Sequence, residues 1–265
     1  MQPSGVITLT TDFGHKGPFS GVMKGVILDR YPSARIVDLG HEIPAHWPAE
    51  AGFWLHRSYR YFPRGTVHLA IVDPGVGTDR RILVVAHDDH IFLAPDNGLL
   101  DPILNEVSGN DVFGIDPPAL EQLGIHSPSL TFHGRDIFAP IAAELAAGRL
   151  LPSALGGPVA DWTPGWIEAP TLDAPGRLSG QVVTIDTFGN LISNIDANLL
   201  DGMQTPIVQL AGHSFAMRAT YGRAEPGDYL ALINSFNVLE VARAEGSAAD
   251  GLGVERGAPI VVAEE

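Results

Sequence analysis

Apolar runs of strand length alternate with segments of helical periodicity over residues 6–150. This alternation predicts a mainly parallel sheet, because each intervening helix returns the chain to the same edge and must cover one face of the sheet. The expected elements are, in chain order, strand 6–10, helix 19–31, strand 35–39, helix 48–59, strand 66–72, a hairpin of strands 81–86 and 90–94 that turns at Asp88 and Asp89, and helix 136–148.

The pattern changes near residue 151. The segment 151–176, LPSALGGPVADWTPGWIEAPTLDAPG, is rich in Pro and Gly and predicts a linker. Short apolar segments at close spacing follow it and predict strands at 181–186, 191–195, 206–210, 228–233 and 258–262. The sequence therefore predicts an α/β domain over 1–150 with helices on both faces of its sheet, a linker over 151–176, and a smaller all-β barrel domain over 177–265.

Composition narrows the class of partner. The formal net charge of −15 argues against nucleic acid, because phosphate binding needs clustered cations. No apolar run approaches the roughly 18 residues of a membrane span, and the opening MQPSGVITL lacks the features of a signal peptide. The chain has no cysteine for a disulfide or a thiolate metal site. We expect a cytoplasmic protein that binds neither nucleic acid nor membrane.

Polar clusters follow the predicted strands. TDFG (11–14) follows the first strand, HEIP (41–44) the second and DPGVG (73–77) the third, and TFHGRD (131–136) opens a helix. In open α/β sheets, ligands bind beyond the carboxyl ends of the strands. The four clusters therefore predict a ligand site along one edge of the sheet.

The glycines of DPGVGTDRR raise the possibility of a phosphate-binding loop. A dinucleotide fingerprint needs a third glycine where Arg80 stands, and a P-loop needs a GK[ST] that is missing. Two interpretations remain: a Pro-Gly turn beside surface arginines, or an ion pair in which Arg80 keeps Asp73 ionised.

Asp12 and His133 each permit several roles. Asp12 fits a metal ligand, an acceptor for two vicinal ribose hydroxyls, or a turn residue before Gly14. The partial positive charge of a helix N-terminus would keep His133 neutral near pH 7, where it accepts a proton, orients a water, or merely caps the helix. A metal site of Asp12, His41, Asp73 and His133 is possible, but these residues lack the close helical spacing of known metal motifs.

The second half of the chain holds two further candidate motifs. In IDTFGNLISNI (185–195), Asp186, Phe188 and Asn190 suit a purine with an amino group nearby, although hairpin chemistry explains the same residues. INSFNVLE (233–240) offers Ser235 in the same ambiguous way. Trp47 fits a core or lid residue as well as a ligand wall.

Seven segments of the sequence, in a fixed order, carry a resemblance to a known family. The chain resembles the S-adenosyl-L-methionine (SAM) hydroxide adenosyltransferases, or SAM hydrolases, which are relatives of fluorinases and chlorinases. The matching segments are LTTDFG, HEIP, VDPGVGT, APDNGLL, TFHGRDIFAP, DTFGNLISNI and LINSFN. The halogenating relatives lack the Asp of VDPGVG, have Tyr in place of His133, and carry an inserted loop after the third strand. The resemblance therefore implies water, rather than halide, as the nucleophile.

The resemblance also implies an architecture and roles for individual residues. It implies an N-terminal α/β domain, a C-terminal β-barrel, a homotrimer with sites between subunits, and a reaction at C5′ that yields adenosine and L-methionine without a metal or other cofactor. The roles that it implies are an Asp-Arg-His triad of Asp73, Arg80 and His133, ribose binding by Asp12, adenine binding by Asn190, methionine binding by Asp186 and Ser235, and a wall formed by Trp47 and Phe188. Two rival classes are a SAM-dependent halogenase and a non-catalytic protein that binds SAM or adenosine.

Overall fold

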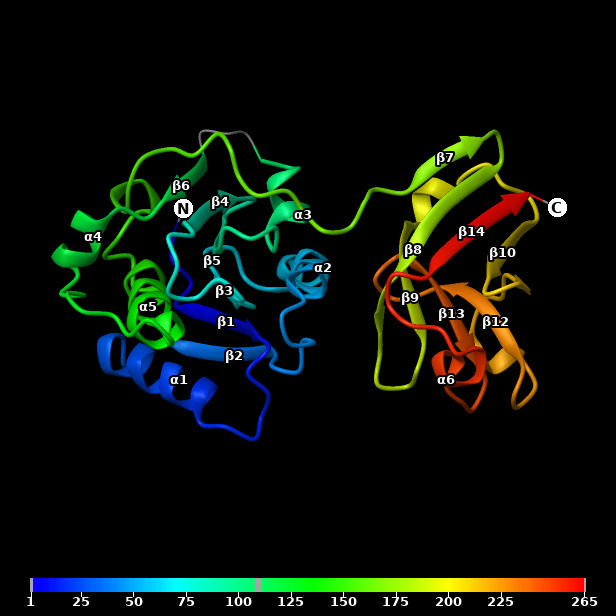
Figure 1. The fold of residues 1–265 in the computed structure, drawn as a ribbon, viewed down its shortest axis with the longest axis horizontal. Helices are drawn as coiled ribbons and strands as arrows, with labels where there is room; N and C mark the ends of the chain where they lie inside the picture. Colours follow the sequence, from blue (N-terminus) through cyan, green and yellow to red (C-terminus); the bar gives the residue numbers. More distant parts are fainter. Residues whose placement is uncertain (1, 108–110, 265) are drawn as a thin grey trace. The chain divides into compact units, whose positions relative to one another are not determined.

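The computed structural model describes residues 2–107 and 111–264. The chain divides into two compact units, Met1–Trp166 and Ile167–Glu265, and each has its own hydrophobic core. Figure 1 shows the first unit as a sheet with helices and the second as a set of strands. Within the described residues, no helix is both long enough and apolar enough to span a membrane.

The first unit is built on a mostly parallel sheet. Its described strands lie in the order β2-β1-β3-β5-β4-β6, and the neighbours β2, β1, β3 and β5 are parallel. Their bounds are β1 Val6–Thr11, β2 Arg35–Gly40, β3 Val67–Ile71, β4 Ile82–His87, β5 His90–Pro95 and β6 Val112–Gly114. The predicted fold class is confirmed.

Helices cover both faces of this sheet, which explains why β1 and β3 are buried along their whole lengths. On one face, Ile7 and Leu9 of β1 pack with residues of α1 (Phe19–Arg30) and α5 (Ala139–Ala146). On the other face, Ala70 of β3 packs with residues of α2 (Pro48–Ser58) and α3 (Asp101–Leu104). A further short helix, α4, spans Pro117–Gln122.

The predicted hairpin is present. β4 and β5 pair antiparallel from Ile82 opposite Pro95 to His87 opposite His90. Asp88 and Asp89 have φ angles of +48° and +61°, as a two-residue hairpin turn of the type that matches strand twist requires.

The second unit is an antiparallel, nearly closed barrel. Its described strands lie in the order β11-β10-β14-β8-β9-β13-β12, with β7 beside β8. A bridge between Met217 and Ala231 brings the two ends of this order together. The bounds are β7 Thr171–Ala174, β8 Arg177–Ile185, β9 Leu191–Asp196, β10 Pro206–Leu210, β11 His213–Ala216, β12 Tyr229–Ile233, β13 Val238–Arg243 and β14 Pro259–Glu264, with the short helix α6 at Ala248–Leu252.

The Pro- and Gly-rich segment 151–176 contains more fixed structure than its composition indicates. Thr163 N donates to Asp96 Oδ1 (2.8 Å), and Trp166 Nε1 donates to the carbonyl of Asn97 (2.9 Å). Strand β7 begins within the same segment and pairs with β8. Residues up to 166 thus belong to the first unit through polar contacts, which leave no periodic pattern in the sequence.

Candidate functional site

The predicted polar clusters meet at one edge of the first sheet. Because β2, β1 and β3 are parallel neighbours, the segments that follow them leave the sheet side by side. Gly14 N donates to the carbonyl of His41 (2.7 Å), and Ile43 N donates to the carbonyl of Thr11 (3.4 Å). TDFG and HEIP are therefore joined backbone to backbone.

Asp73, Arg80 and His133 form one connected cluster. Arg80 Nε donates to both carboxylate oxygens of Asp73 (3.0 Å each), and Arg80 Nη2 lies 2.5 Å from Asp73 Oδ2. The same Nη2 lies 2.9 Å from His133 Nδ1. The side chains of Asp73 and Arg80 are only 5% and 11% exposed, so solvent screens this pair weakly. Arg81 instead pairs with Asp96 and Asp161.

The contact with Arg80 determines where His133 carries its proton. A guanidinium only donates hydrogen bonds, so Nδ1 of the imidazole accepts from Arg80 and a neutral ring carries its proton on Nε2. Burial, and after it the charge of Arg80, lower the pKa of His133, although Asp73 opposes the shift. His133 is therefore a neutral Nε2–H donor at neutral pH, so it orients a ligand oxygen more readily than it accepts a proton.

His133 lies at the start of a helix, as predicted, but the helix begins irregularly. A π-helical turn spans Gly134–Phe138 and leads into α5, and Ala139 N donates to the carbonyl of Gly134, five residues earlier. Pro140 has no N–H for the regular bond four residues back, which favours the wider turn.

The glycine loop supports this cluster by close backbone approach. Gly77 has a φ of +80°, and a Cβ at this position would lie 2.2 Å from the carbonyl oxygen of Leu130. Leu130 precedes the segment that carries His133. Gly77 thus brings the DPGVG loop against the TFHG loop, a role different from phosphate binding.

A hollow of about 340 Å³ lies beside the cluster, and it is called here the α/β hollow. Asp12, Asp73 and His133 line it, together with Phe13, Phe19, His46, Ile71, Val76, Thr131, Phe132 and Gly134. Asp12 Oδ2 accepts from His46 N (3.2 Å), which leaves its other carboxylate oxygen available to a ligand.

Three aromatic side chains form an apolar wall of the α/β hollow, and the sequence predictions missed them. The ring centroids of Phe13, Phe19 and Phe132 lie 5.4–6.0 Å apart in tilted and edge-to-face pairs. Phe13 and Phe132 lie inside two of the predicted polar motifs, so their proximity to Asp12 and His133 in the sequence was the available signal.

Two residues of the possible metal site have other partners. His41 Nδ1 contacts Thr11 Oγ1 (2.8 Å) and Asp73 pairs with Arg80, so both have other partners. Across the residues that the structure describes, no group of three or more His, Asp or Glu side chains is arranged to hold a metal ion.

In the second unit, Asp186 organises the turn between β8 and β9. Its Oδ1 accepts from the amides of Phe188 and Asn190 (2.9 Å each), and its Oδ2 accepts from Asn190 Nδ2 (3.0 Å). Because a carboxylate only accepts, this contact fixes the orientation of the Asn190 amide. The amide oxygen of Asn190 then points away from Asp186 and is a suitable acceptor for an exocyclic amino group.

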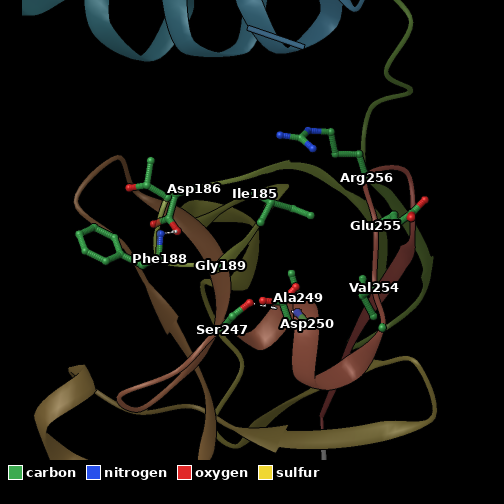
Figure 2. A pocket seen from close by; sticks show the side chains of 12 residues that line it. Ile185, Asp186, Phe188, Gly189, Ser247, Ala249, Asp250, Val254, Glu255 and Arg256 are labelled. Atoms are coloured by element: carbon green, nitrogen blue, oxygen red, sulfur yellow. Dashed lines mark hydrogen bonds between the residues drawn. The ribbon is translucent and has the colours of Figure 1, made fainter. Parts of the chain in front are cut away.

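A larger hollow of about 640 Å³, the barrel hollow, lies between this turn and the α6 segment. Figure 2 shows Asp186 and Phe188 on one side of it, Ser247 at its base, and Glu255 and Arg256 on the opposite side. Phe188 is 76% exposed, so its ring offers a free apolar face.

Ser235 and Trp47 line neither hollow, and neither do Arg80 and Asn190, although these two contact the lining residues Asp73 and Asp186. Ser235 is exposed in the turn between β12 and β13. Trp47 precedes α2, and its ring lies 6.2 Å from that of Trp166, so it packs within the first unit. The predicted residues thus form one cluster in the first unit and a looser set in the second.

These features define a class: a two-unit chain with an α/β fold, a small β-barrel, and a buried Asp-Arg-His cluster beside a hollow. The model described as SAM hydroxide adenosyltransferase N-terminal domain matches residues 7–156, and the model for the C-terminal domain of the same family matches residues 180–261. The chain belongs to the SAM hydroxide adenosyltransferase family.

Individual relatives agree with this placement. An (R)-S-adenosyl-L-methionine hydrolase from Thermus thermophilus is 36% identical over 270 residues, which cover 98% of this chain and 99% of the relative. A fluorinase from Actinopolyspora mzabensis is 26% identical over an alignment that covers 97% of this chain and 96% of the fluorinase. The crystal structure of an uncharacterized conserved protein from Thermotoga maritima superimposes with a TM-score of 0.88 at 34% identity, covering 97% of this chain and 99% of that one.

Proposed function

We propose that this protein hydrolyses SAM to adenosine and L-methionine. The observation that carries the proposal is the buried Asp73–Arg80–His133 cluster at the edge of a hollow that also exposes Asp12. The full-length similarity to proteins named (R)-S-adenosyl-L-methionine hydrolase supports the same reaction.

In the proposed reaction, water attacks C5′ in line with the C5′–S bond. The C5′–O bond forms, the C5′–S bond breaks with its electron pair going to sulfur, and one proton is released to solvent. The sulfonium leaves as neutral methionine, so the reaction requires neither metal nor redox cofactor. The protein's task is to place the water and to exclude competing solvent, for which the wall of Phe13, Phe19 and Phe132 is suited.

The cluster suits water better than halide. His133 Nε2–H donates to the oxygen of the attacking water, and the carboxylate of Asp73 accepts a hydrogen bond from that water. A halide has no proton to donate and would meet a negative charge in Asp73. Chloride-dependent formation of 5′-chloro-5′-deoxyadenosine would contradict this assignment and favour a halogenase.

The proposed substrate contacts follow the predicted roles. Asp12 accepts hydrogen bonds from the two ribose hydroxyls, and the amide oxygen of Asn190 accepts from the adenine amino group. Asp186 and Ser235 bind the methionine portion, and Phe188 and Trp47 wall the ligand. Oδ2 of Asp186 accepts one hydrogen bond within its turn and retains capacity for the ammonium group of methionine.

We further propose a cytoplasmic homotrimer with a domain boundary near 151–176 and active sites between subunits. The ribose and water-positioning residues belong to the first unit, and the adenine and methionine residues belong to the second. A ligand as small as SAM must then contact both kinds of unit, and a closed ring of copies provides such contacts.

The reaction is tested with SAM, a chelator and heavy-oxygen water. The expected result is adenosine and methionine in equal amounts, with the heavy oxygen at C5′ of adenosine. Adenosine without the label, or methylthioadenosine as the main product, would refute the hydrolase assignment. Binding of SAM without turnover would instead identify a non-catalytic sensor.

The assembly is tested by mixing two inactive variants, His133→Ala and Asn190→Ala, after dissociation and reassembly. Sites between subunits predict partial recovery of activity, since some interfaces would pair an intact first unit with an intact second unit. No recovery in verified mixed oligomers would place each site within one chain.

A further inference from the structure

We infer that His41 and Thr11 are positioning residues for the ribose-binding carboxylate of Asp12. A chain of polar contacts runs from Lys24 through Asp38 and His41 to Thr11, the residue before Asp12. The inference rests on the proposed function, which assigns the ribose hydroxyls to Asp12.

The contacts of the chain are short, and the contact between Thr11 and His41 is buried. Thr11 Oγ1 lies 2.8 Å from His41 Nδ1, and Thr11 and His41 are 0% and 1% exposed. His41 Nε2 lies 3.0 Å from Asp38 Oδ1, at ion-pair distance but without the alignment of a good hydrogen bond. Lys24 Nζ donates to Asp38 Oδ2 at 2.6 Å. The chain of contacts therefore begins at Lys24, which is partly exposed, and ends at Thr11, which is buried.

These contacts are consistent with one arrangement of protons. Burial opposes ionisation of Asp38, but Lys24 and His41 outweigh it and lower the pKa of Asp38, so that this carboxylate only accepts. His41 then presents Nε2–H to Asp38, and its Nδ1 accepts from the hydroxyl of Thr11. The lone pairs of that hydroxyl accept from Phe13 N (3.2 Å). The donors thus converge on the carboxylate of Asp38, with Lys24 on one side and His41, itself reached from Thr11, on the other.

The end of this chain of contacts fixes the backbone that follows Asp12. Phe13 N is held by the hydroxyl of Thr11, and Gly14 N donates to the carbonyl of His41 (2.7 Å). Within the described residues, the carboxylate of Asp12 itself receives one hydrogen bond, from His46 N. The direction of the carboxylate therefore depends mainly on the backbone that Thr11 and His41 hold.

Thr10, the residue before Thr11, allows the positioning role of Thr11 to be separated from the effect of burial alone. Thr10 is 1% exposed, and its Oγ1 has no hydrogen-bond partner in the described part of the chain. Thr10 and Thr11 are consecutive in β1 and equally buried, yet only Thr11 connects to His41. Thr10→Val is consequently a matched control for Thr11→Val.

The experiment measures dissociation constants by calorimetry for adenosine and for 2′,3′-dideoxyadenosine, which lacks the hydroxyls that Asp12 is proposed to bind. Wild-type protein should prefer adenosine, and Asp12→Ala should remove that preference. Thr11→Val should weaken adenosine binding roughly tenfold, on the scale of a hydrogen bond to a charged group, while binding of the dideoxy compound stays the same. Thr10→Val should change neither.

His41→Asn is a second variant, because an asparagine amide oxygen keeps an acceptor near Thr11 but breaks the contact with Asp38. It should weaken adenosine binding less than His41→Ala does. Adding His41→Ala to Asp12→Ala should cause no further loss, since the carboxylate that His41 positions is already gone. A merely structural role would instead lower thermal stability and leave the preference for adenosine intact.

Each outcome decides the inference. If Asp12→Ala reduces the preference but Thr11→Val and His41→Ala do not, the positioning role is wrong while the ribose site stands. If Asp12→Ala leaves the preference unchanged, the ribose assignment fails, and the inference fails with it. If Thr11→Val and His41→Asn both fail to fold while Thr10→Val folds, the contacts serve the stability of the fold and the positioning role is wrong.

Discussion

Replacing Arg80 by methionine separates the charge of this side chain from its length. In the wild type, the guanidinium donates to both oxygens of Asp73 and to His133 Nδ1 at 2.9 Å. Methionine fills a similar volume but donates to neither residue. The imidazole of His133 then loses the contact that fixes its orientation and its proton on Nε2.

The magnitude follows from the bonds that are lost. A hydrogen bond to a charged group contributes about 1.5–3 kcal/mol, and each 1.4 kcal/mol in the barrier is tenfold in rate. Arg80→Met should therefore lower kcat about tenfold to a hundredfold through the contact with His133 alone. The unpaired carboxylate of Asp73 adds to the loss. Affinity for adenosine should change little, because Arg80 is not assigned to the ligand.

The pH dependence of kcat gives an independent readout. Burial and the charge of Arg80 lower the pKa of His133, and Asp73 opposes them. Without Arg80, the pKa of His133 rises, so the imidazolium persists to higher pH, and its charge makes the water that it contacts a weaker nucleophile. The acid limb of the profile of kcat against pH should therefore move to higher pH in Arg80→Met.

Arg81→Met is the matched control, since Arg81 pairs with Asp96 at 2.8 Å and has no contact with His133. It should keep near-normal kcat and the wild-type acid limb. The triad assignment would be wrong if Arg80→Met kept kcat within a fewfold of wild type, or if Arg81→Met caused an equal loss with an equal shift of the acid limb.

Two further predictions concern the first unit. Gly77→Ala should destabilise the protein by about 2 kcal/mol or more and reduce activity, because strain at positive φ adds to a clash with the Leu130 carbonyl. Gly124 also has positive φ but has open space around it, so Gly124→Ala should lower the free energy of unfolding by the strain alone. Equal losses in denaturant unfolding would contradict the clash. Burial, then the charge of His90, lower the pKa of His68 to about 3. On acidification, His68 is therefore protonated at a higher pH in the unfolded chain than in the folded protein. The free energy of unfolding should fall as the pH drops from 6.5 towards 3, by up to about 1.4 kcal/mol per pH unit. His68→Phe should flatten this dependence, and an unchanged slope would contradict the reasoning.

The sequence was sufficient for the parts of the fold that periodicity governs. Strands β1 and β3 are rich in apolar residues and buried along their whole lengths because helices cover both faces of the sheet. The Asp88-Asp89 turn follows from residues that tolerate positive φ. Parallel order then places the residues that follow neighbouring strands at one edge. For this reason Asp12 and Asp73 were predicted to lie near each other, and both line the α/β hollow.

Elements that depend on tertiary contacts were not predictable in the same way. Strand β13 was missed as a strand because Glu240 interrupts its apolar run. Glu240 is nevertheless 2% exposed, since Tyr221 and Asn234 both donate to its carboxylate. The role of His41 was equally hidden, because its partners Thr11 and Asp38 come from two different strands whose pairing the sequence does not state.

The hydrogen bonds that Asp186 accepts have a thermodynamic consequence for the second unit. They fix the amides of Phe188 and Asn190 and the side chain of Asn190 before any ligand arrives. A purine docking there would immobilise few additional torsions, so little conformational entropy would be lost on association. The association rate at this turn should therefore be that of a preformed surface, and differences in affinity between ligands should come mainly from their dissociation rates.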